Sequence, residues 1–429
     1  MSSEWRVQKI SSLGEFERGK SKHRPRDAAH LYGGLYPFIQ TGDITNSGGR
    51  ITTFRQTYSD AGLAQSRIWP AGTLAITIAA NIAETALLTF PACFPDSVVG
   101  FTADKAKADV RFIEYLFQAM RKQVKSHAYG SAQENINLEV LRKLEFPIPC
   151  LETQTKIADY LTILDDRITL LRETNTTLEA IAQALFKSWF VDFDPTHAKM
   201  QGRAPEGMDE STAALFPDSF EGSELGAVPK GWSVGDLNDL AELNPESWSA
   251  KHHPKRILYV DLANTKAGEI DDFNEFSFED APSRARRVLK SGDVIVGTVR
   301  PGNRSFARIA SDIAGLTGST GFAVLRAREV MDHALIYIAA TNDEAIDRLA
   351  HLADGGAYPA VRPEVVGSTP MVIAPKAIRN LFGEIANPFF ARIGVNQDCM
   401  RQLASLRDTL LPRLISGQIN LAEVATEII

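Results

Sequence analysis

Two runs of apolar residues constrain the fold of this chain more than any other feature. From Ile157 to Trp189, apolar positions recur at alternating steps of four and three residues. Adding 225 to these numbers gives a second run, from Phe382 to Leu414, with the same spacing and two polar lapses. A repeat of 3.5 residues keeps one face of a helix against a partner helix, so each run predicts a long helix with a coiled-coil seam. The positions expected to pair the helices are Ile157, Leu161, Leu164, Ile168, Leu171, Asn175, Leu178 and Leu185 in the first helix and Phe382, Phe389, Ile393, Asn396, Met400, Leu403, Leu410 and Leu414 in the second.

The length of these helices implies that they pair with each other. A helix of roughly 40 residues is about 60 Å long at 1.5 Å per residue, and alone it would expose its apolar stripe to water. If the two halves of the chain are related by a pseudo-two-fold axis, the pairing is antiparallel and the globular parts lie at opposite ends. Pro388 is expected to weaken or bend the second helix near its start, or to mark where its regular part begins.

An asparagine interrupts each seam. A buried asparagine lowers the stability of a helix pair but can fix its pairing and register, whereas a partly exposed one is an ordinary surface residue. The sequence favours neither interpretation for Asn175 or for Asn396.

The rest of the chain is duplicated as well. A tryptophan followed by a short alternating run stands near the start of each half, at Trp5 and Trp232, and Ile136 and Val361 are 225 positions apart. Segments 68–74 and 288–294 are both typical of a turn that leads into a buried strand. We therefore expect an α+β protein in which two similar domains are separated by two long antiparallel helices. The expected boundaries are 1–150 for the first domain, 151–194 for the first helix, 195–230 for a connector, 231–374 for the second domain, and 375–429 for the second helix and C-terminal tail.

The charge of the chain is unevenly distributed. The net charge is −7, which by itself argues against a nucleic-acid partner, but a DNA footprint is local. Residues 18–26 contain five basic residues and no acid, and residues 284–308 contain seven basic residues and one acid. A single run of this kind is more often a solvated surface, but two runs in corresponding halves favour DNA contact. The basic residues are Arg18, Lys20, Lys22, Arg24 and Arg26, and Arg284, Arg286, Arg287, Lys290, Arg300, Arg304 and Arg308.

Two enzyme-like motifs are interpreted as accidental. Residues 14–21 match a phosphate-binding loop, but the residues that follow, including Pro25, cannot continue as the helix that such a loop needs. Residues 387–390 read Asn-Pro-Phe-Phe, as in adenine methyltransferases, but the aromatic residues belong to or adjoin a helix seam and no dinucleotide-type glycine fingerprint accompanies them. No Ser-His-Asp or Cys-His set can be assembled. We therefore expect no catalytic residue in this chain.

The cysteines and the hydropathy pattern indicate a soluble, cytoplasmic protein. Cys93, Cys150 and Cys399 lie far apart and have no histidine at metal-ligand spacing, so neither a disulfide framework nor a metal site is expected. The N-terminus lacks an apolar signal core. The most apolar stretch, 74–88, contains Glu84 and would bury a charge in a bilayer.

The ordered set of motifs resembles the specificity subunits of type I restriction-modification systems. The resemblance covers nearly the whole chain, and the motifs are specific only in combination. One departure is that the second Pro-x-Pro element reads Ile373-Ala-Pro375. The motifs are Phe146-Pro-Ile-Pro149, Glu152-Thr-Gln154 with Ile157, Leu185 to Phe193, Leu215-Phe-Pro-Asp-Ser219, Pro229-Lys-Gly-Trp232 and Leu406 to Gly417.

This resemblance implies a non-catalytic subunit whose two target-recognition domains read the two parts of a split, asymmetric DNA site, with the helices as spacer. It also implies two modification (methyltransferase) subunits docked on the helices and two motor-nuclease restriction subunits. S-adenosylmethionine, ATP and Mg²⁺ would be used by those partners, and none would bind this chain directly.

Base reading requires amide or guanidinium groups that can make two hydrogen bonds to one base. Residues of this kind that punctuate predicted loops, together with one tyrosine, are the candidate base readers. They are Gln40, Asn81, Gln133 and Asn135 in the first domain, and Arg300, Asn303, Arg304, Tyr358 and Arg362 in the second.

Two other functions fit the sequence less well. A helical scaffold whose globular ends bind proteins or glycans would agree with the acidic net charge. A self-contained methyltransferase or ATPase would require one of the two rejected motifs to be functional.

Overall fold

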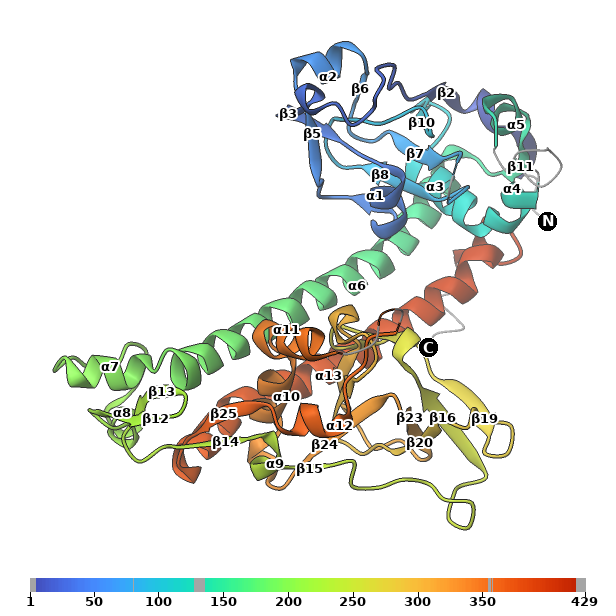
Figure 1. Cartoon of the computed structure of the whole chain (residues 1–429). Coiled ribbons are helices and arrows are strands. Elements are labelled where there is room, and N and C mark those ends of the chain that lie inside the picture. Colours follow the sequence, from blue (N-terminus) through green and yellow to red (C-terminus); the bar gives the residue numbers. More distant parts are fainter. Residues whose placement is uncertain (1–4, 80, 127–135, 354–355, 357, 422–429) are drawn as a thin grey trace. The chain divides into compact units, whose positions relative to one another are not determined.

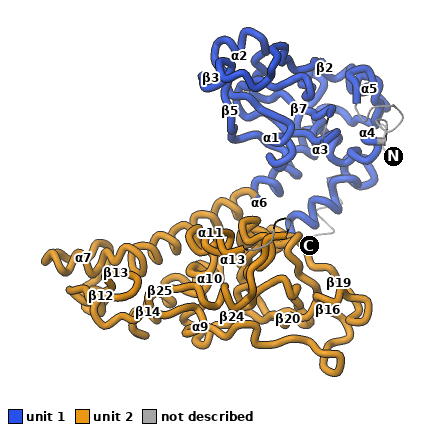
Figure 2. Tube along the Cα trace, viewed as in Figure 1, with its two compact units in different colours: residues 1–168, 402–429 blue, residues 169–401 orange. Residues whose placement is uncertain are grey.

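The computed structural model describes residues 5–79, 81–126, 136–353, 356 and 358–421 (Figure 1). The chain divides into unit 1, residues 1–168 and 402–429, and unit 2, residues 169–401 (Figure 2). Each unit contains an α+β domain and a length of each of two long helices, α6 (Leu151–Phe186) and α13 (Lys376–Ile415). The α+β fold class expected from the sequence is thus confirmed. None of the helices in these residues has the length and apolarity needed to cross a lipid bilayer.

Unit 1 contains two main sheets. The first has the strand order β2-β10-β7-β8-β4, and the second has the order β5-β3-β9-β6, in which β3 and β9 are parallel. A separate antiparallel pair joins β1 to β11. The strands are β1 (Arg6–Lys9), β2 (Gly14–Arg18), β3 (Tyr32–Phe38), β4 (Arg50–Ile51), β5 (Gln56–Tyr58), β6 (Ile68–Trp69), β7 (Leu74–Thr77), β8 (Thr85–Leu88), β9 (Ala92–Cys93), β10 (Val98–Ala103) and β11 (Glu145–Ile148).

The core of unit 1 forms where these sheets meet helices. Strands β7 and β8 are buried at every position. Apart from Thr77 and Thr85 their residues are apolar, and their sequences do not alternate. Phe16 and Phe101 pack with ring centroids 4.7 Å apart, and Phe112 of α3 belongs to the same core cluster. The short helices are α1 (Thr41–Asn46), α2 (Asp60–Ala64), α3 (Val110–Ala119), α4 (Arg121–Ser126) and α5 (Leu138–Lys143).

Unit 2 repeats this topology. One sheet has the order β15-β24-β21-β22, the other has the order β19-β16-β23-β20 with β16 and β23 parallel, and β14 pairs with β25. The strands are β14 (Ser233–Asp236), β15 (Ala241–Leu243), β16 (Arg256–Val260), β19 (Asn274–Ser277), β20 (Ala285–Val288), β21 (Val294–Gly297), β22 (Phe306–Arg308), β23 (Leu316–Ser319), β24 (Phe322–Ala327) and β25 (Pro370–Ile373), with a small hairpin of β17 (Thr265–Lys266) and β18 (Glu269–Ile270).

The remaining elements of unit 2 are a connector and four short helices. The connector between the first long helix and the second domain contains a hairpin and two helices. Its elements are α7 (Asp194–Met200), α8 (Glu210–Leu215), β12 (Phe220–Ser223) and β13 (Gly226–Pro229). The helices of the domain are α9 (Leu237–Leu240), α10 (His333–Thr341), α11 (Asp343–Leu352) and α12 (Pro363–Gly367).

The matching strand orders confirm the duplication expected from the sequence. Strands β3, β9, β7 and β10 of unit 1 correspond to β16, β23, β21 and β24 of unit 2. Even the turn before the buried strand is repeated, because Gly72 and Gly292 both have a positive φ, 81° and 87°. A side chain is disfavoured in that conformation, which explains the glycine at both positions.

The two long helices run antiparallel where they pair in unit 2. Phe186 near the end of α6 packs near Phe382 at the start of α13, and Asn175 pairs with Asn396 farther along. In unit 1, Leu161 of α6 and Leu414 of α13 share one core cluster. The predicted pseudo-two-fold relation between the units stays a prediction.

Pro388 does not mark the start of the second helix. Helix α13 begins at Lys376 and continues through Pro388 to Ile415. The proline removes one backbone donor from the helix, but the turns on both sides are held by the packing of Phe382 and Phe390 in the core of unit 2. Tertiary packing therefore outweighs the local preference of proline.

Candidate nucleic-acid interface

The predicted helix-pairing positions lie on the inner faces of α6 and α13. In unit 1 the buried positions are Ile157, Leu161, Leu164, Ile168, Leu410 and Leu414, and in unit 2 they are Leu171, Asn175, Phe382, Ile393, Asn396 and Met400. Leu178, Leu185, Phe389 and Leu403 are half-buried. Phe186, which follows Leu185, and Phe390, which follows Phe389, are buried in place of those two predicted positions. An α-helix has 3.6 residues per turn, so the buried face drifts away from a strict 3.5-residue repeat.

The two seam asparagines form a buried pair. Asn396 Nδ2 donates a hydrogen bond of 2.7 Å to Asn175 Oδ1, and the side chains are 1% and 7% exposed. Of the two interpretations that the sequence left open, the structure therefore shows the buried one. Asn175 Nδ2 is buried and has no hydrogen-bond partner among the described residues.

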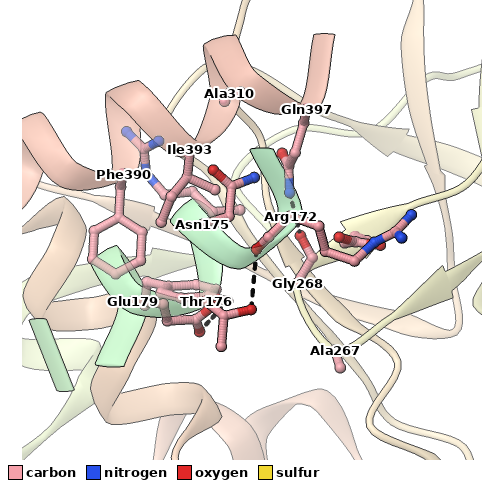
Figure 3. A pocket seen from close by; sticks show the side chains of 14 residues that line it. Arg172, Asn175, Thr176, Glu179, Ala267, Gly268, Ala310, Phe390, Ile393 and Gln397 are labelled. Atoms are coloured by element: carbon pink, nitrogen blue, oxygen red, sulfur yellow. Dashed lines mark hydrogen bonds between the residues drawn. The ribbon is translucent and has the colours of Figure 1, made fainter. Parts of the chain in front are cut away.

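A small cavity lies where the second domain packs on the helices within unit 2 (Figure 3). It encloses about 100 Å³ and is lined by residues of α6, α13 and the domain. The Tyr337 hydroxyl donates to Glu179 at 3.1 Å, and Gln397 Nε2 donates to the Gly268 carbonyl at 3.1 Å. Burial raises the pKa of Glu179. These polar contacts attach the domain to its helices.

Two glycines of α13 also mark this attachment. A Cβ atom on Gly383 would collide with the carbonyl of Met331, and one on Gly394 would lie 2.6 Å from the Cβ of Ala310. A glycine inside a helix costs about 1 kcal/mol relative to alanine. At these two positions it permits the backbone of the domain to approach the helix.

Two predicted DNA-binding arginines of the second domain face this attachment instead of the exposed loops. Arg308 lines the cavity, its Nε has no hydrogen-bond partner among the described residues, and burial lowers its pKa. Arg304 forms an ion pair of 2.7 Å with Asp343 and lies over the ring of Phe306. The second basic run is therefore not one continuous surface, because successive strand residues point to opposite faces.

The exposed candidates lie in two loops that are joined in the same way in both domains. In unit 1 the Ile136 amide donates to the Ile78 carbonyl at 3.2 Å, and in unit 2 the Val361 amide donates to the Thr298 carbonyl at 2.9 Å. Asn81 is exposed in the first of these loops. Gln133 and Asn135 would belong to its neighbour but lie outside the described residues.

The corresponding loops of unit 2 bring four candidates together. The backbone amide of Arg300 donates to the Pro359 carbonyl at 2.8 Å, and its guanidinium lies 5.0 Å from the ring centroid of Tyr358. Tyr358 is 73% exposed. Asn303 and Arg362 are exposed on the same two loops. Aromatic and guanidinium groups joined in this way can contact bases by stacking and by hydrogen bonds.

The first basic run of unit 1 is organised around one acid. Arg26 binds both carboxylate oxygens of Asp96, at 2.8 and 2.9 Å, and Arg24 lies 3.8 Å from the same carboxylate. Arg18 donates to the Asp96 carbonyl. Lys20 and Lys22 are exposed, and their ammonium groups have no ion-pair partner in the described part of the chain. These two lysines are the cations of this run that remain available for phosphate groups.

Arginines at the start of the second run are partly engaged within the domain. Arg284 donates to the Tyr259 hydroxyl at 3.1 Å and to Asp261 at 3.2 Å. Arg286 lies over the ring of Phe278, and burial lowers the pKa of Arg287. Arg284 is the most exposed of the three.

The two enzyme-like motifs lie in ordinary secondary structure, one in a strand and one inside a helix. Residues 14–18 of the phosphate-loop pattern are strand β2, and no helix follows it before Ala29. Asn387 lies inside α13 and accepts a hydrogen bond of 3.0 Å from the amide of Ala334 at the start of α10. The described residues contain no group of three or more His, Cys, Asp or Glu side chains suited to a metal ion.

Other residues near the candidates were not predicted from the sequence. Gln40 Nε2 donates a hydrogen bond of 2.6 Å to Gln56 Oε1, and Asn81 Nδ2 donates to Thr45 Oγ1 at 3.2 Å. Gln56 opens a strand and no turn signal marks it, so nothing in the sequence distinguished it from a surface residue. Helix α1 thus has one of these polar contacts at each end.

Comparison with known proteins shows what the chain is similar to. Residues 2–180 match the family described as type I restriction modification DNA specificity domain. Residues 2–180 are thus similar to this DNA specificity domain. The chain is 25% identical over 440 residues to the MjaIX specificity subunit of Methanocaldococcus jannaschii, covering 98% of this chain and 95% of that protein. It is also 25% identical over 334 residues to the HindI specificity subunit of Haemophilus influenzae, covering 66% and 71% of the two chains.

A solved structure has a similar fold over nearly the whole chain. The S subunit of a type I restriction-modification system from M. genitalium superposes with a TM-score of 0.58 at 14% identity, covering 96% of this chain and 97% of that one. Together with the family match and the relatives, this confirms the resemblance to type I specificity subunits that the repeated motifs indicated.

Proposed function

We propose that this chain is the non-catalytic specificity subunit of a type I restriction-modification complex and reads a bipartite, asymmetric DNA site. Each domain would read one part of the site, and the helices would set the distance between the parts. Methyltransferase and motor-nuclease subunits, two of each, would dock on the chain. They would use S-adenosylmethionine, ATP and Mg²⁺, and the assembly would act in the cytoplasm.

One observation carries this proposal: the domains share a strand order but present different side chains in matching loops. Asn81 in unit 1 stands where unit 2 has Arg300 and Asn303. Amide groups suit adenine and guanidinium groups suit guanine. Two readers of one architecture with unlike side chains are what an asymmetric split site requires.

The exchange of one domain tests the proposal. Residues 1–150 would be replaced by the corresponding domain of another specificity subunit, and methylated adenines would be mapped in host DNA that also carries the partner subunits. We expect one half of the methylated sequence to change and the other half to remain. A change in both halves, or in neither, would contradict the proposal.

The reciprocal exchange is the matched control. Replacement of residues 231–374 should change only the other half of the methylated sequence. A host that lacks the chain but retains the methyltransferase subunits should show no methylation at the site. If the domains bound proteins or glycans instead, none of these exchanges would alter methylation.

A further inference from the structure

We propose that Gln40 reads an adenine in the major groove and that Gln56 holds it in the reading position. This inference rests on the proposed function and names one base contact of the first domain. Gln40 lies two residues beyond the end of β3 at Phe38. Gln56 opens β5, the neighbouring antiparallel strand, and is the register partner of Phe38. Both side chains are exposed.

The hydrogen bond between the two amides leaves a specific set of groups. Gln40 Nε2 gives one hydrogen to Gln56 Oε1 at 2.6 Å. It retains a second hydrogen. Gln40 Oε1 accepts from the Asp43 backbone amide in the capping box at the start of α1, and it keeps a second lone pair that can accept from a base. Adenine presents an acceptor at N7 and a donor at its N6 amino group in the major groove, and a single glutamine amide matches both. The edge of guanine offers two acceptors there and does not match.

The backbone beneath Gln40 is rigid, which a base reader requires. Ile39 is fully buried, and its amide donates to the Cys93 carbonyl at 2.8 Å. Phe38 stacks on Tyr58 with ring centroids 4.0 Å apart. The Gln40 amide donates to Asp43 at 2.9 Å, which fixes the start of α1.

Phosphate-binding groups lie at the same edge of the sheet. Strands β3 and β9 are parallel neighbours with Phe38 beside Cys93, so the segments that follow them, Ile39–Gln40 and Phe94, leave the sheet at the same end. The Phe94 carbonyl accepts from the Lys20 amide at 3.2 Å, which brings the basic run to that edge. A DNA-binding protein combines phosphate contacts, which position it, with base contacts, which specify the sequence. The lysines would supply the first kind here and the Gln40 amide the second.

The matching corner of unit 2 carries different chemistry. Asp261 follows β16 directly and accepts a hydrogen bond of 3.2 Å from Arg284. Arg284 precedes β20, which corresponds to β6 and not to β5, the strand of Gln56. The strands correspond, but an acid held by an arginine stands beyond β16 where an amide held by an amide stands beyond β3. A corner that varies on a constant framework is a place where two half-sites can be distinguished.

The test uses the full chain in complex with its methyltransferase subunits and duplexes that carry each single base-pair substitution in the first half-site. Competition binding should show that Gln40→Ala lowers the preference for A·T at one position by roughly tenfold, the order expected for one bidentate contact. Gln56→Leu should weaken the same preference, and Gln56→Glu, which keeps an acceptor for Gln40, should restore it. Base preferences in the second half-site should be unchanged. As a control, Gln402→Ala, which replaces an exposed glutamine of α13, should leave the preferences in both half-sites unchanged.

The outcomes separate this inference from the proposed function. If Gln40→Ala leaves every preference intact, or changes a G·C position, the inference is wrong although the chain still reads DNA. If the wild-type complex has no sequence preference, the proposed function itself fails. If Gln40→Ala melts at a lower temperature than the wild type, its lost preference could reflect misfolding. Gln40→Glu then provides the test, because it keeps the acceptor for adenine N6 and removes the donor to N7. An unchanged adenine preference in Gln40→Glu overturns the inference.

Discussion

Asn396 donates a buried hydrogen bond to Asn175 in the apolar seam between α13 and α6. The bond joins residues 221 positions apart. A polar pair in an apolar seam lowers stability but is satisfied in only one register. The pair therefore opposes sliding of one helix along the other within unit 2.

Replacing both asparagines should separate these two effects. We expect Asn175→Leu with Asn396→Leu to be as stable as the wild type or more so, because apolar residues of similar volume replace a desolvated pair. Asn396→Leu alone should destabilise by about 1–3 kcal/mol, because Asn175 would keep a buried amide without its partner. Urea unfolding measures both. Equal destabilisation by the single and double variants would contradict the pairing.

Glu114 should make the stability of unit 1 depend on pH. Burial raises its pKa to about 8 from the ordinary value of 4.5 for a glutamate. Above pH 4.5 the unfolded chain loses a proton that the folded state keeps, so stability falls as pH rises toward 8 and then levels off. At pH 7 the cost is on the order of 3 kcal/mol. Glu114→Gln should melt at a higher temperature than the wild type at pH 7, and the difference should nearly vanish at pH 4.5. A difference that does not vary with pH would exclude this role.

Lys20 and Lys22 should account for part of the salt dependence of DNA binding. Each phosphate neutralised contributes roughly 0.9 to the slope of log K against log salt. The double variant Lys20→Ala with Lys22→Ala should therefore reduce the slope by up to about 2 for every sequence alike. Fluorescence anisotropy of labelled DNA with the full complex, repeated at several salt concentrations, measures this slope. Lys376→Ala, which breaks an ion pair with Glu329 in unit 2, is the control and should leave the slope unchanged.

Tyr337→Phe should loosen the attachment of the second domain to its helices. The variant would remove one of two donors to Glu179 Oε1, because Gln183 Nε2 also donates to it at 3.3 Å. We expect a cost of about 1 kcal/mol. Tyr36→Phe, whose exposed hydroxyl donates to Asp60 at 3.0 Å, is the matched control and should change stability little. Hydrogen exchange of α10 should rise only in the first variant. Equal exchange in both would argue against the attachment.

Tyr358→Ala should affect the reading of the second half-site alone. The ring supports the Arg300 guanidinium at 5.0 Å, a contact worth about 0.5–1 kcal/mol at an exposed site. Methylation mapped at reduced expression should show a relaxed second half and an intact first half. Leu352→Ala, another exposed residue of unit 2, should leave both halves intact.

The elements predicted best from the sequence were those that depend on local periodicity. The heptad steps from Ile157 to Trp189 gave the location of α6, and the fixed offset of 225 gave the second helix and the repeated sheets. Pro388 was interpreted from its local preference alone, and packing around Phe382 outweighed that preference.

The arrangement of polar side chains was predicted less well, since it depends on contacts between distant segments. Arg304 was grouped with exposed arginines, but it pairs with Asp343, 39 residues later. Arg26 pairs with Asp96, 70 residues away. Charge runs in a sequence do not show which members such partners neutralise, and Gln56 carried no signal until its strand was placed beside Gln40.

The glycines of α13 determine which foreign domains this chain can accept. Gly383 and Gly394 leave room only for a carbonyl and for the methyl group of Ala310. A transplanted domain with a bulky side chain in place of that alanine would not seat against the helix, whatever DNA it recognises. Shuffling of recognition modules among such chains is therefore filtered by steric fit at the spacer before it is filtered by the DNA sequence.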